Sequence, residues 1–128
     1  MSKVLPSMSK APPAEVVVID DDEAVLDSFR FMLQAAGVEV ATYPSATDYL
    51  ARRGAPPRCL ILDQHMPRMT GLELAERLRA DGSAVPILLV TSLVSPMIVA
   101  RAAELGVAPV LQKPPAEDCI LRFVATCA

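Results

Sequence analysis

The stretch that decides the fold is VVVIDDDEAV, residues 16–25, in which four branched apolar residues run directly into three aspartates and a glutamate. A short run of branched aliphatic residues predicts a strand that is buried on both faces. The following segment, DEAVLDSFRFMLQAAG, ends with Gly37 where a left-handed residue closes a helix. Its apolar residues recur at helical spacing and are expected to face the core: Val25, Phe29, Met32, Leu33 and Ala36.

This pairing of a strand with a helix recurs five times along the chain. Strands are predicted at 15–20, 38–42, 58–63, 86–91 and 108–112, and helices at 22–37, 45–53, 71–82, 96–105 and from about 116 onward. Such alternation predicts a parallel sheet with helices on both faces. Right-handed crossovers leave few windings, and we favour the order 2-1-3-4-5 of flavodoxin and the chemotaxis protein CheY. The prediction is a single flavodoxin-like α/β domain with three layers.

Several helix boundaries are also readable. Ser45 can cap the second helix, and Ser95 followed by Pro96 is typical of the start of the fourth. The last helix is expected to bury Ile120, Phe123 and Val124.

Composition narrows the class of protein. At 128 residues the chain has the size of one domain, and we expect residues 1–14, rich in Pro, Ser and Lys, to be a flexible tail before a domain at 15–128. A net charge of −3 without a basic cluster argues against direct nucleic-acid binding. No segment is typical of a signal peptide or a membrane span, and the three cysteines show no pairing pattern, so we expect a cytoplasmic protein with reduced thiols and a Cys59 that is plain core.

The polar residues stand where the predicted strands end. Asp20 and Asp21 follow the first strand, Asp63 ends the third, Thr91 ends the fourth and Lys113 follows the fifth. Ligands of open α/β sheets bind beyond the carboxyl ends of the strands, near the point where the winding reverses. Carboxylates crowded there repel one another unless a cation lies among them, and Mg²⁺, with Mn²⁺ as a substitute, suits an all-oxygen site. One aspartate could then act as a nucleophile toward phosphorus.

Four segments together resemble the receiver domain of bacterial two-component response regulators: VVVIDDDEAV, LILDQHMPRMTGLEL, ILLVTS and VLQKPP, in this order. SATDYLA and MPRMTGLEL are similar to the FixJ-type branch. The resemblance implies that Asp63 accepts phosphate from a phosphohistidine. It further implies that Mg²⁺ is held by the carboxylates of Asp20, Asp21 and Asp63 and by the backbone carbonyl of His65.

The same resemblance implies roles for the remaining polar residues. Lys113 would contact the phosphoryl group, with a cis bond to Pro114, and Thr91 would turn its hydroxyl toward the phosphoryl oxygen. Asp22 is then free to cap the first helix. The His65 side chain is disfavoured as a Mg²⁺ ligand, since the ion prefers oxygen, and is expected instead to tune the lifetime of the phosphoryl group.

The expected partner is a sensor histidine kinase or a phosphotransfer protein, with no membrane contact. The chain is expected not to be an enzyme beyond metal-dependent self-phosphorylation and autodephosphorylation. The helix at 96–105 is either a partly apolar contact surface or only an alanine-rich helix. A homodimer through the fourth helix, fifth strand and fifth helix is a further expectation.

One departure leaves an alternative open. Receivers commonly carry an aromatic residue where this chain has Val110, so the aromatic half of the usual switch is missing. A pseudo-receiver, which serves as a constitutive interaction module, is the runner-up. A haloacid dehalogenase-type hydrolase is disfavoured because His65 stands where its second aspartate belongs, and a flavin binder because the first loop is acidic.

Overall fold

The computed structural model describes residues 15–52 and 54–127 as one α/β domain. Its strands are β1 (Val16–Ile19), β2 (Val40–Tyr43), β3 (Cys59–Asp63), β4 (Ile87–Thr91) and β5 (Val110–Gln112). Its helices are α2 (Glu23–Ala35), α3 (Ala46–Leu50), α4 (Gly71–Ala80), α5 (Pro96–Glu104) and α6 (Glu117–Thr126). All strand pairs are parallel and the order is β2-β1-β3-β4-β5, which confirms the predicted flavodoxin-like fold.

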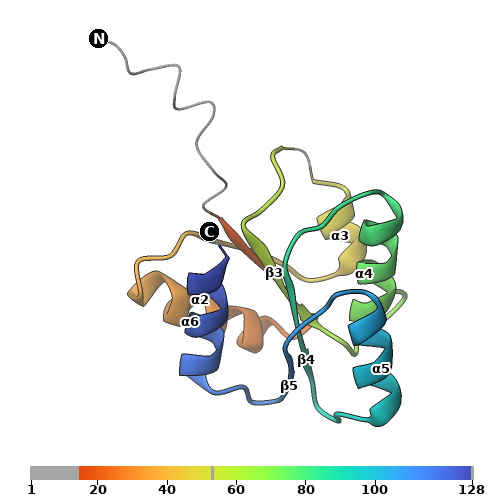
Figure 1. The fold of residues 1–128 in the computed structure, drawn as a ribbon. Helices are drawn as coiled ribbons and strands as arrows, with labels where there is room; N and C mark the ends of the chain where they lie inside the picture. Colours follow the sequence, from red (N-terminus) through yellow and green to blue (C-terminus); the bar gives the residue numbers. More distant parts are fainter. Residues whose placement is uncertain (1–14, 53, 128) are drawn as a thin grey trace.

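Helices cover both faces of the sheet, with α2 and α6 on one side and α3, α4 and α5 on the other (Figure 1). Successive residues of a strand point to opposite faces, so each strand supplies both layers of core. Val18 and Ile61 pack with α2 and α6, whereas Ile19 and Leu62 pack with α3, α4 and α5. This two-sided burial explains why β1, β3 and β4 read as continuous aliphatic runs.

The second strand begins later than predicted, at Val40 instead of Val38. The backbone N–H of Gly37 donates to the carbonyl of Gln34, and that of Val38 donates to the carbonyl of Leu33. These two bonds form a Schellman motif around the left-handed Gly37, whose φ is 79°. The predicted left-handed helix end is confirmed, and it uses the N–H that Val38 would have contributed to the strand.

Other boundaries also differ from the sequence prediction. Helix α3 ends at Leu50, ahead of the predicted Arg53, which lies outside the described residues, as does the predicted tail at 1–14. Strand β5 begins at Val110, two residues late. Ala36 is exposed at the end of α2, and the buried position on this helix that the sequence reading missed is Leu26.

The predicted caps are confirmed. The side chains of Asp22, Ser45 and Ser95 each accept a backbone N–H of the helix that follows them. The last helix buries Ile120, Phe123 and Val124, as expected. None of the helices within 15–52 and 54–127 combines the length and apolar character needed to span a bilayer.

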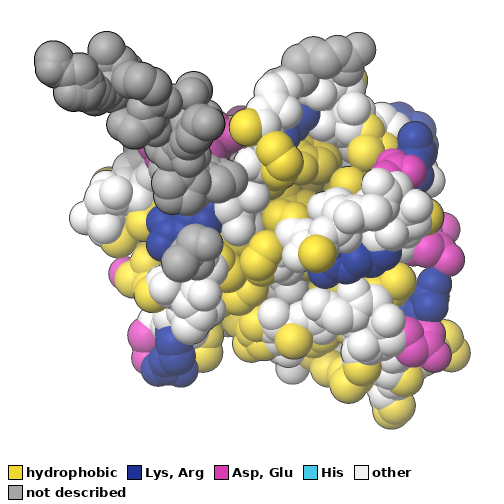
Figure 2. All heavy atoms as spheres, turned by 45° about the horizontal axis from the view of Figure 1, so that its top comes forward, with side chains coloured by type: hydrophobic (Ala, Val, Ile, Leu, Met, Phe, Trp, Pro, Cys, Tyr) yellow, Lys and Arg dark blue, Asp and Glu magenta, His cyan; other side chains and the backbone are white. Residues whose placement is uncertain are grey.

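On the face that Figure 2 shows, acidic and basic side chains alternate along the outer helices and no broad basic field forms. Arg101 forms exposed ion pairs with Glu76 at 2.7 Å and with Glu104 at 2.8 Å. The prediction that the chain does not bind nucleic acid directly stays a prediction.

Candidate functional site at the carboxyl ends of the strands

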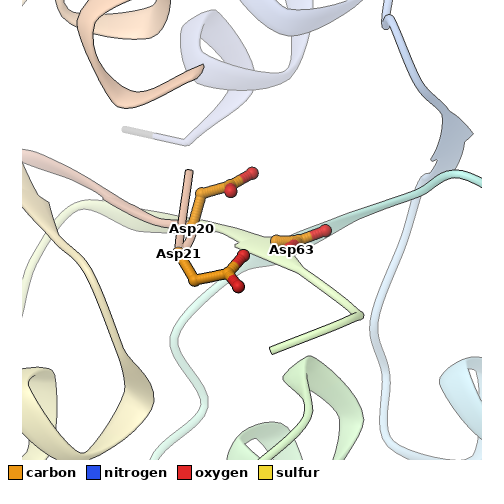
Figure 3. Close-up of side chains that lie close together, drawn as sticks. All are labelled: Asp20, Asp21 and Asp63. Carbon is orange, nitrogen blue, oxygen red and sulfur yellow. The ribbon is translucent and has the colours of Figure 1, made fainter. Parts of the chain in front are cut away.

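The sheet register brings the acidic residues of two strands together. Ile19 of β1 pairs with Leu62 of β3, so the next residues, Asp20 and Asp63, lie side by side at the carboxyl ends of the two strands. Figure 3 shows Asp20 and Asp21 at the end of β1 next to Asp63 at the end of β3. One carboxylate oxygen from each of the three lies within 4.8 Å of the others.

Lys113 joins this group from the segment that follows β5. Its ammonium lies 2.9 Å from Oδ2 of Asp20 and 3.0 Å from Oδ1 of Asp63. The two carboxylates are almost fully buried, at 2% and 4% exposure. The peptide bond between Lys113 and Pro114 is cis, as predicted.

Electrostatics at Asp63 reflect this crowding. Burial raises the pKa of its carboxyl group, and the nearby carboxylate of Asp20 adds to the rise, while Lys113 and the backbone N–H of His65 oppose it. Burial by itself would lower the pKa of Lys113, but its hydrogen bonds and charge attraction to Asp20 and Asp63 raise it. The raised pKa of Lys113 keeps its ammonium protonated beside the two carboxyl groups.

The three consecutive aspartates do three different things. Asp20 is buried and accepts the backbone N–H of Asp22 at 2.9 Å, which fixes its carboxylate. Asp21 is exposed but turns an oxygen toward the cluster. Asp22 caps α2 by accepting the N–H of Ala24 at 2.9 Å.

The donor set fits a hard divalent cation. Three carboxylates converge with a single ammonium between two of them, and carboxylate oxygens are the ligands that Mg²⁺ prefers. The exposed side at Asp21 leaves room for the waters that Mg²⁺ retains.

Comparisons with known proteins agree with this geometry. The family model of the response regulator receiver domain matches residues 16–125. The chain belongs to this family. It is 36% identical over 110 residues to the transcriptional regulatory protein FixJ of Bradyrhizobium diazoefficiens, a match that covers 85% of this chain and 54% of that protein. The receiver chain thus spans about half the length of the curated relatives it matches.

Solved structures show the same fold. The structure titled response regulator StyR superposes with a TM-score of 0.80 at 36% identity, over 91% of this chain and 59% of that one. Chemotaxis protein CheY4 of Vibrio cholerae gives a TM-score of 0.82 at 28% identity, over 91% of this chain and all of that chain. The FixJ amino-terminal structure gives 0.77 at 27% identity, over 91% and 94% of the two chains.

Thr91, the last residue of β4, is a further predicted residue of the receiver site. It is fully buried, and its Oγ1 donates to the carbonyl of Leu93 at 3.2 Å and accepts the N–H of the same residue at 3.3 Å. The hydroxyl therefore holds the loop between β4 and α5. The predicted turn of this hydroxyl toward a phosphoryl group stays a prediction.

The loop after Asp63 carries the remaining predicted residue of the receiver site. His65 has an exposed side chain, and its backbone N–H favours the ionised form of Asp63 by lowering the pKa of that carboxyl group. Its predicted part in metal binding, through the backbone carbonyl, stays a prediction.

The sequence reading missed two residues of this loop. A Cβ on Gly71 would lie 2.6 Å from the backbone oxygen of Asp63, so only glycine allows α4 to start this close to the site. Gln64 bonds to the first turn of α4 through its backbone carbonyl and its side chain. The start of α4 only a few residues after Met66 and Pro67 indicates that the helix begins close to the strand end, where a glycine is needed. No local sequence pattern indicates the role of Gln64.

Apolar side chains gather beyond Thr91. Leu93 and Met97 are 67% and 80% exposed, and Val94 and Val99 are also exposed. These residues belong to the loop before α5 and to its first turns, and both predictions for the helix at 96–105, a partly apolar contact surface or only an alanine-rich helix, stay predictions.

Proposed function

We propose that this receiver domain is a phosphoacceptor switch in which Asp63 takes phosphate in a Mg²⁺-dependent reaction. The observation that carries the proposal is the convergence of Asp20, Asp21 and Asp63 within 4.8 Å, with Lys113 bonded to two of them. In this proposal the three carboxylates and the backbone carbonyl of His65 would hold Mg²⁺, which would supply positive charge to offset the charge on a transferring phosphoryl group.

The residues of the chain supply the rest of the chemistry. An oxygen of Asp63 attacks phosphorus, the bond from phosphorus to the donor nitrogen breaks, and the leaving imidazole keeps that electron pair. Lys113, already within 3.0 Å of Asp63, stabilises the phosphoryl oxygens. Thr91 loses its bonds to Leu93 when its hydroxyl turns to the phosphoryl group, which releases the loop before α5.

Receiver domains of response regulators take phosphate from histidine kinases or phosphotransfer proteins. We expect such a partner here. A mainly apolar hollow of about 480 Å³ lies beside Lys113, between α2 and the segment Pro114–Pro115, and suits an apolar side chain next to the donor histidine. The protein would then act on itself, by self-phosphorylation and autodephosphorylation, and not as an enzyme on a separate substrate.

Incubation with Mg²⁺ and acetyl phosphate tests the proposal. We expect intact-mass spectrometry to find one added phosphate per chain, and none in Asp63→Asn. Asp81→Asn is the matched control, because Asp81 is exposed at the end of α4, where it pairs with Arg77, and is expected to accept phosphate like the wild type. A wild-type mass that stays unchanged at saturating donor would contradict the proposal.

The pseudo-receiver alternative differs by its partner binding. Val110 is its main support, whereas the complete set of acids, Thr91 and Lys113 favours a working phosphoacceptor. Equal partner affinity with and without the phosphodonor would favour the alternative.

A further inference from the structure

Gln64, the residue directly after the phosphoacceptor, ties the site to a helix on the opposite face of the sheet. Asp63 faces the acid cluster, and because side chains alternate along a strand, Gln64 points to the other face, where α4 begins. Its side-chain Oε1 accepts the N–H of Leu72 at 2.9 Å, and its backbone carbonyl accepts the N–H of Gly71 at 3.2 Å. Its own N–H donates to the carbonyl of Val90 at 2.9 Å.

These bonds account for the start of α4. A helix leaves its first four N–H groups without partners inside the helix. Here the N–H groups of Thr70 and Glu73 are satisfied by the capping box between those two residues. The other two, on Gly71 and Leu72, are both satisfied by Gln64. Half of this helix start therefore depends on the residue next to the phosphoacceptor.

The other helices with side-chain caps are closed locally. The starts of α2, α3 and α5 are capped by Asp22, Ser45 and Ser95, each directly before its helix. In α4 the Gln64 side chain reaches across the loop to a residue eight positions later. Gly71 also lets this helix approach the backbone oxygen of Asp63 closely. A shift of the strand end and a shift of α4 are therefore mechanically linked.

The same clamp fixes the backbone that follows. His65 comes directly after Gln64, and its backbone N–H is close enough to the Asp63 carboxyl group to lower the pKa of that group. With Gln64 held at three points, the His65 peptide has little freedom. We propose that Gln64 is a positioning residue, which presents the His65 backbone to the cation site and couples occupancy of that site to the first turn of α4. The inference rests on the proposed cation site and adds a residue and a route of coupling to it.

Equilibrium binding of Mn²⁺, followed by electron paramagnetic resonance of the free ion, tests the positioning role. Gln64→Met has a similar length but no acceptor for Leu72. Because the partners that orient metal ligands typically contribute 10- to 100-fold to affinity, we expect its Mn²⁺ dissociation constant to rise about tenfold. Thr70→Ala is the control: it removes an N–H acceptor at the same helix start, for Glu73, and leaves the Gln64 bond in place, so wild-type affinity is expected.

A second measurement needs no variant. Coupling free energies are reciprocal, so Mg²⁺ should stabilise the bond from Leu72 to Gln64. We expect saturating Mg²⁺ to slow amide hydrogen exchange at Leu72 more than at Ile98, whose N–H is capped locally by Ser95 at 3.2 Å.

The outcomes separate the two proposals. A wild-type protein that binds no Mn²⁺ would overturn the proposed function and this inference with it. Wild-type binding with equal affinity in Gln64→Met, or an equal loss in Thr70→Ala, would overturn the role of Gln64 alone. So would Mg²⁺-induced slowing at Leu72 that is no greater than at Ile98.

Discussion

The two ends of β3 carry charge in opposite ways. At the amino end, the guanidinium of Arg58 donates to the carbonyls of Cys127 at 2.6 Å and Val124 at 3.0 Å, the last carbonyls of α6. At the carboxyl end, the buried carboxylates of Asp63 and Asp20 share one ammonium, that of Lys113. The strand between them is completely buried.

The difference teaches which charges hold the fold and which prepare it for a ligand. A cation at a helix C-terminus is fully compensated, because it donates to carbonyls without partners in the helix and lies at the negative end of the helix dipole. Two buried carboxyl groups that share one ammonium are only partly compensated, and Asp21 adds a third acid beside them. The contacts at the amino end are therefore fully paired, whereas Lys113 compensates the acids at the carboxyl end only in part, and a further cation would stabilise that end.

Lys113→Met should give the largest effect on stability. Removing one partner of a buried ion pair leaves charge without compensation, and since Lys113 is itself about a quarter exposed we expect a loss of about 3 kcal/mol. Urea unfolding near pH 7 without divalent ions measures this loss. Lys113→Arg keeps the charge and should recover most of the stability; an unstable Lys113→Arg would indicate that shape, and not charge, decides.

Mg²⁺ should stabilise the wild type by a somewhat smaller amount, about 2.7 kcal/mol at a concentration 100 times its dissociation constant. Burial raises the pKa of Asp63, so folding favours the protonated form of this carboxyl group. The stability that this protonated form contributes is fully present below the pKa of an unfolded aspartate. It is lost as the pH rises through the higher pKa of the folded state. The benefit of Mg²⁺ should thus be full near pH 7 and fade as the pH falls and Asp63 is protonated. Calorimetric melting temperatures with and without Mg²⁺, at matched ionic strength, check this; a shift that does not depend on pH would contradict it.

Arg58→Met should cost about 2 kcal/mol, because hydrogen bonds that involve a charged group contribute roughly 1.5–3 kcal/mol. Phosphorylation by acetyl phosphate should be unchanged, since Arg58 lies at the end of β3 remote from the acids. Arg122→Met is the control: Arg122 is exposed, its ion pair with Asp118 spans 3.9 Å, and a change within about 0.5 kcal/mol is expected. Reduced phosphorylation in folded Arg58→Met would show that the two ends are not independent.

The smallest effect concerns the thiols at the amino end. Burial, together with the neighbouring Cys127, raises the pKa of Cys59 to about 12, so its reactive thiolate is scarce at neutral pH. We expect an aromatic disulfide reagent to modify the partly exposed Cys119 quickly and Cys59 only after unfolding in urea. Fast labelling of Cys59 in the native protein, located by peptide mass mapping, would show that this end of the sheet opens readily.

Much of the site could be predicted because its residues stand at strand ends. In a parallel sheet, Asp20, Asp63, Thr91 and Lys113 must emerge at one edge once their strands are identified, and the register of β1 with β3 confirms this for the two aspartates. Boundaries were less accurate. The sequence predicts Val38 in a strand, but its N–H donates to the carbonyl of Leu33 at the end of α2. Whether this N–H bonds to the helix or to a neighbouring strand depends on the geometry of the helix end.

The sequence by itself determined the alternation of strands and helices, the caps at Asp22, Ser45 and Ser95, and the edge at which the acids gather, since each follows from local spacing and side-chain chemistry. The tertiary structure decided that the hydroxyl of Thr91 bonds to Leu93, that Gln64 closes the start of α4, and that Arg58 joins β3 to the end of α6. These contacts depend on which surfaces packing brings within hydrogen-bonding distance. The spacing of residues along the chain does not indicate which surfaces come this close.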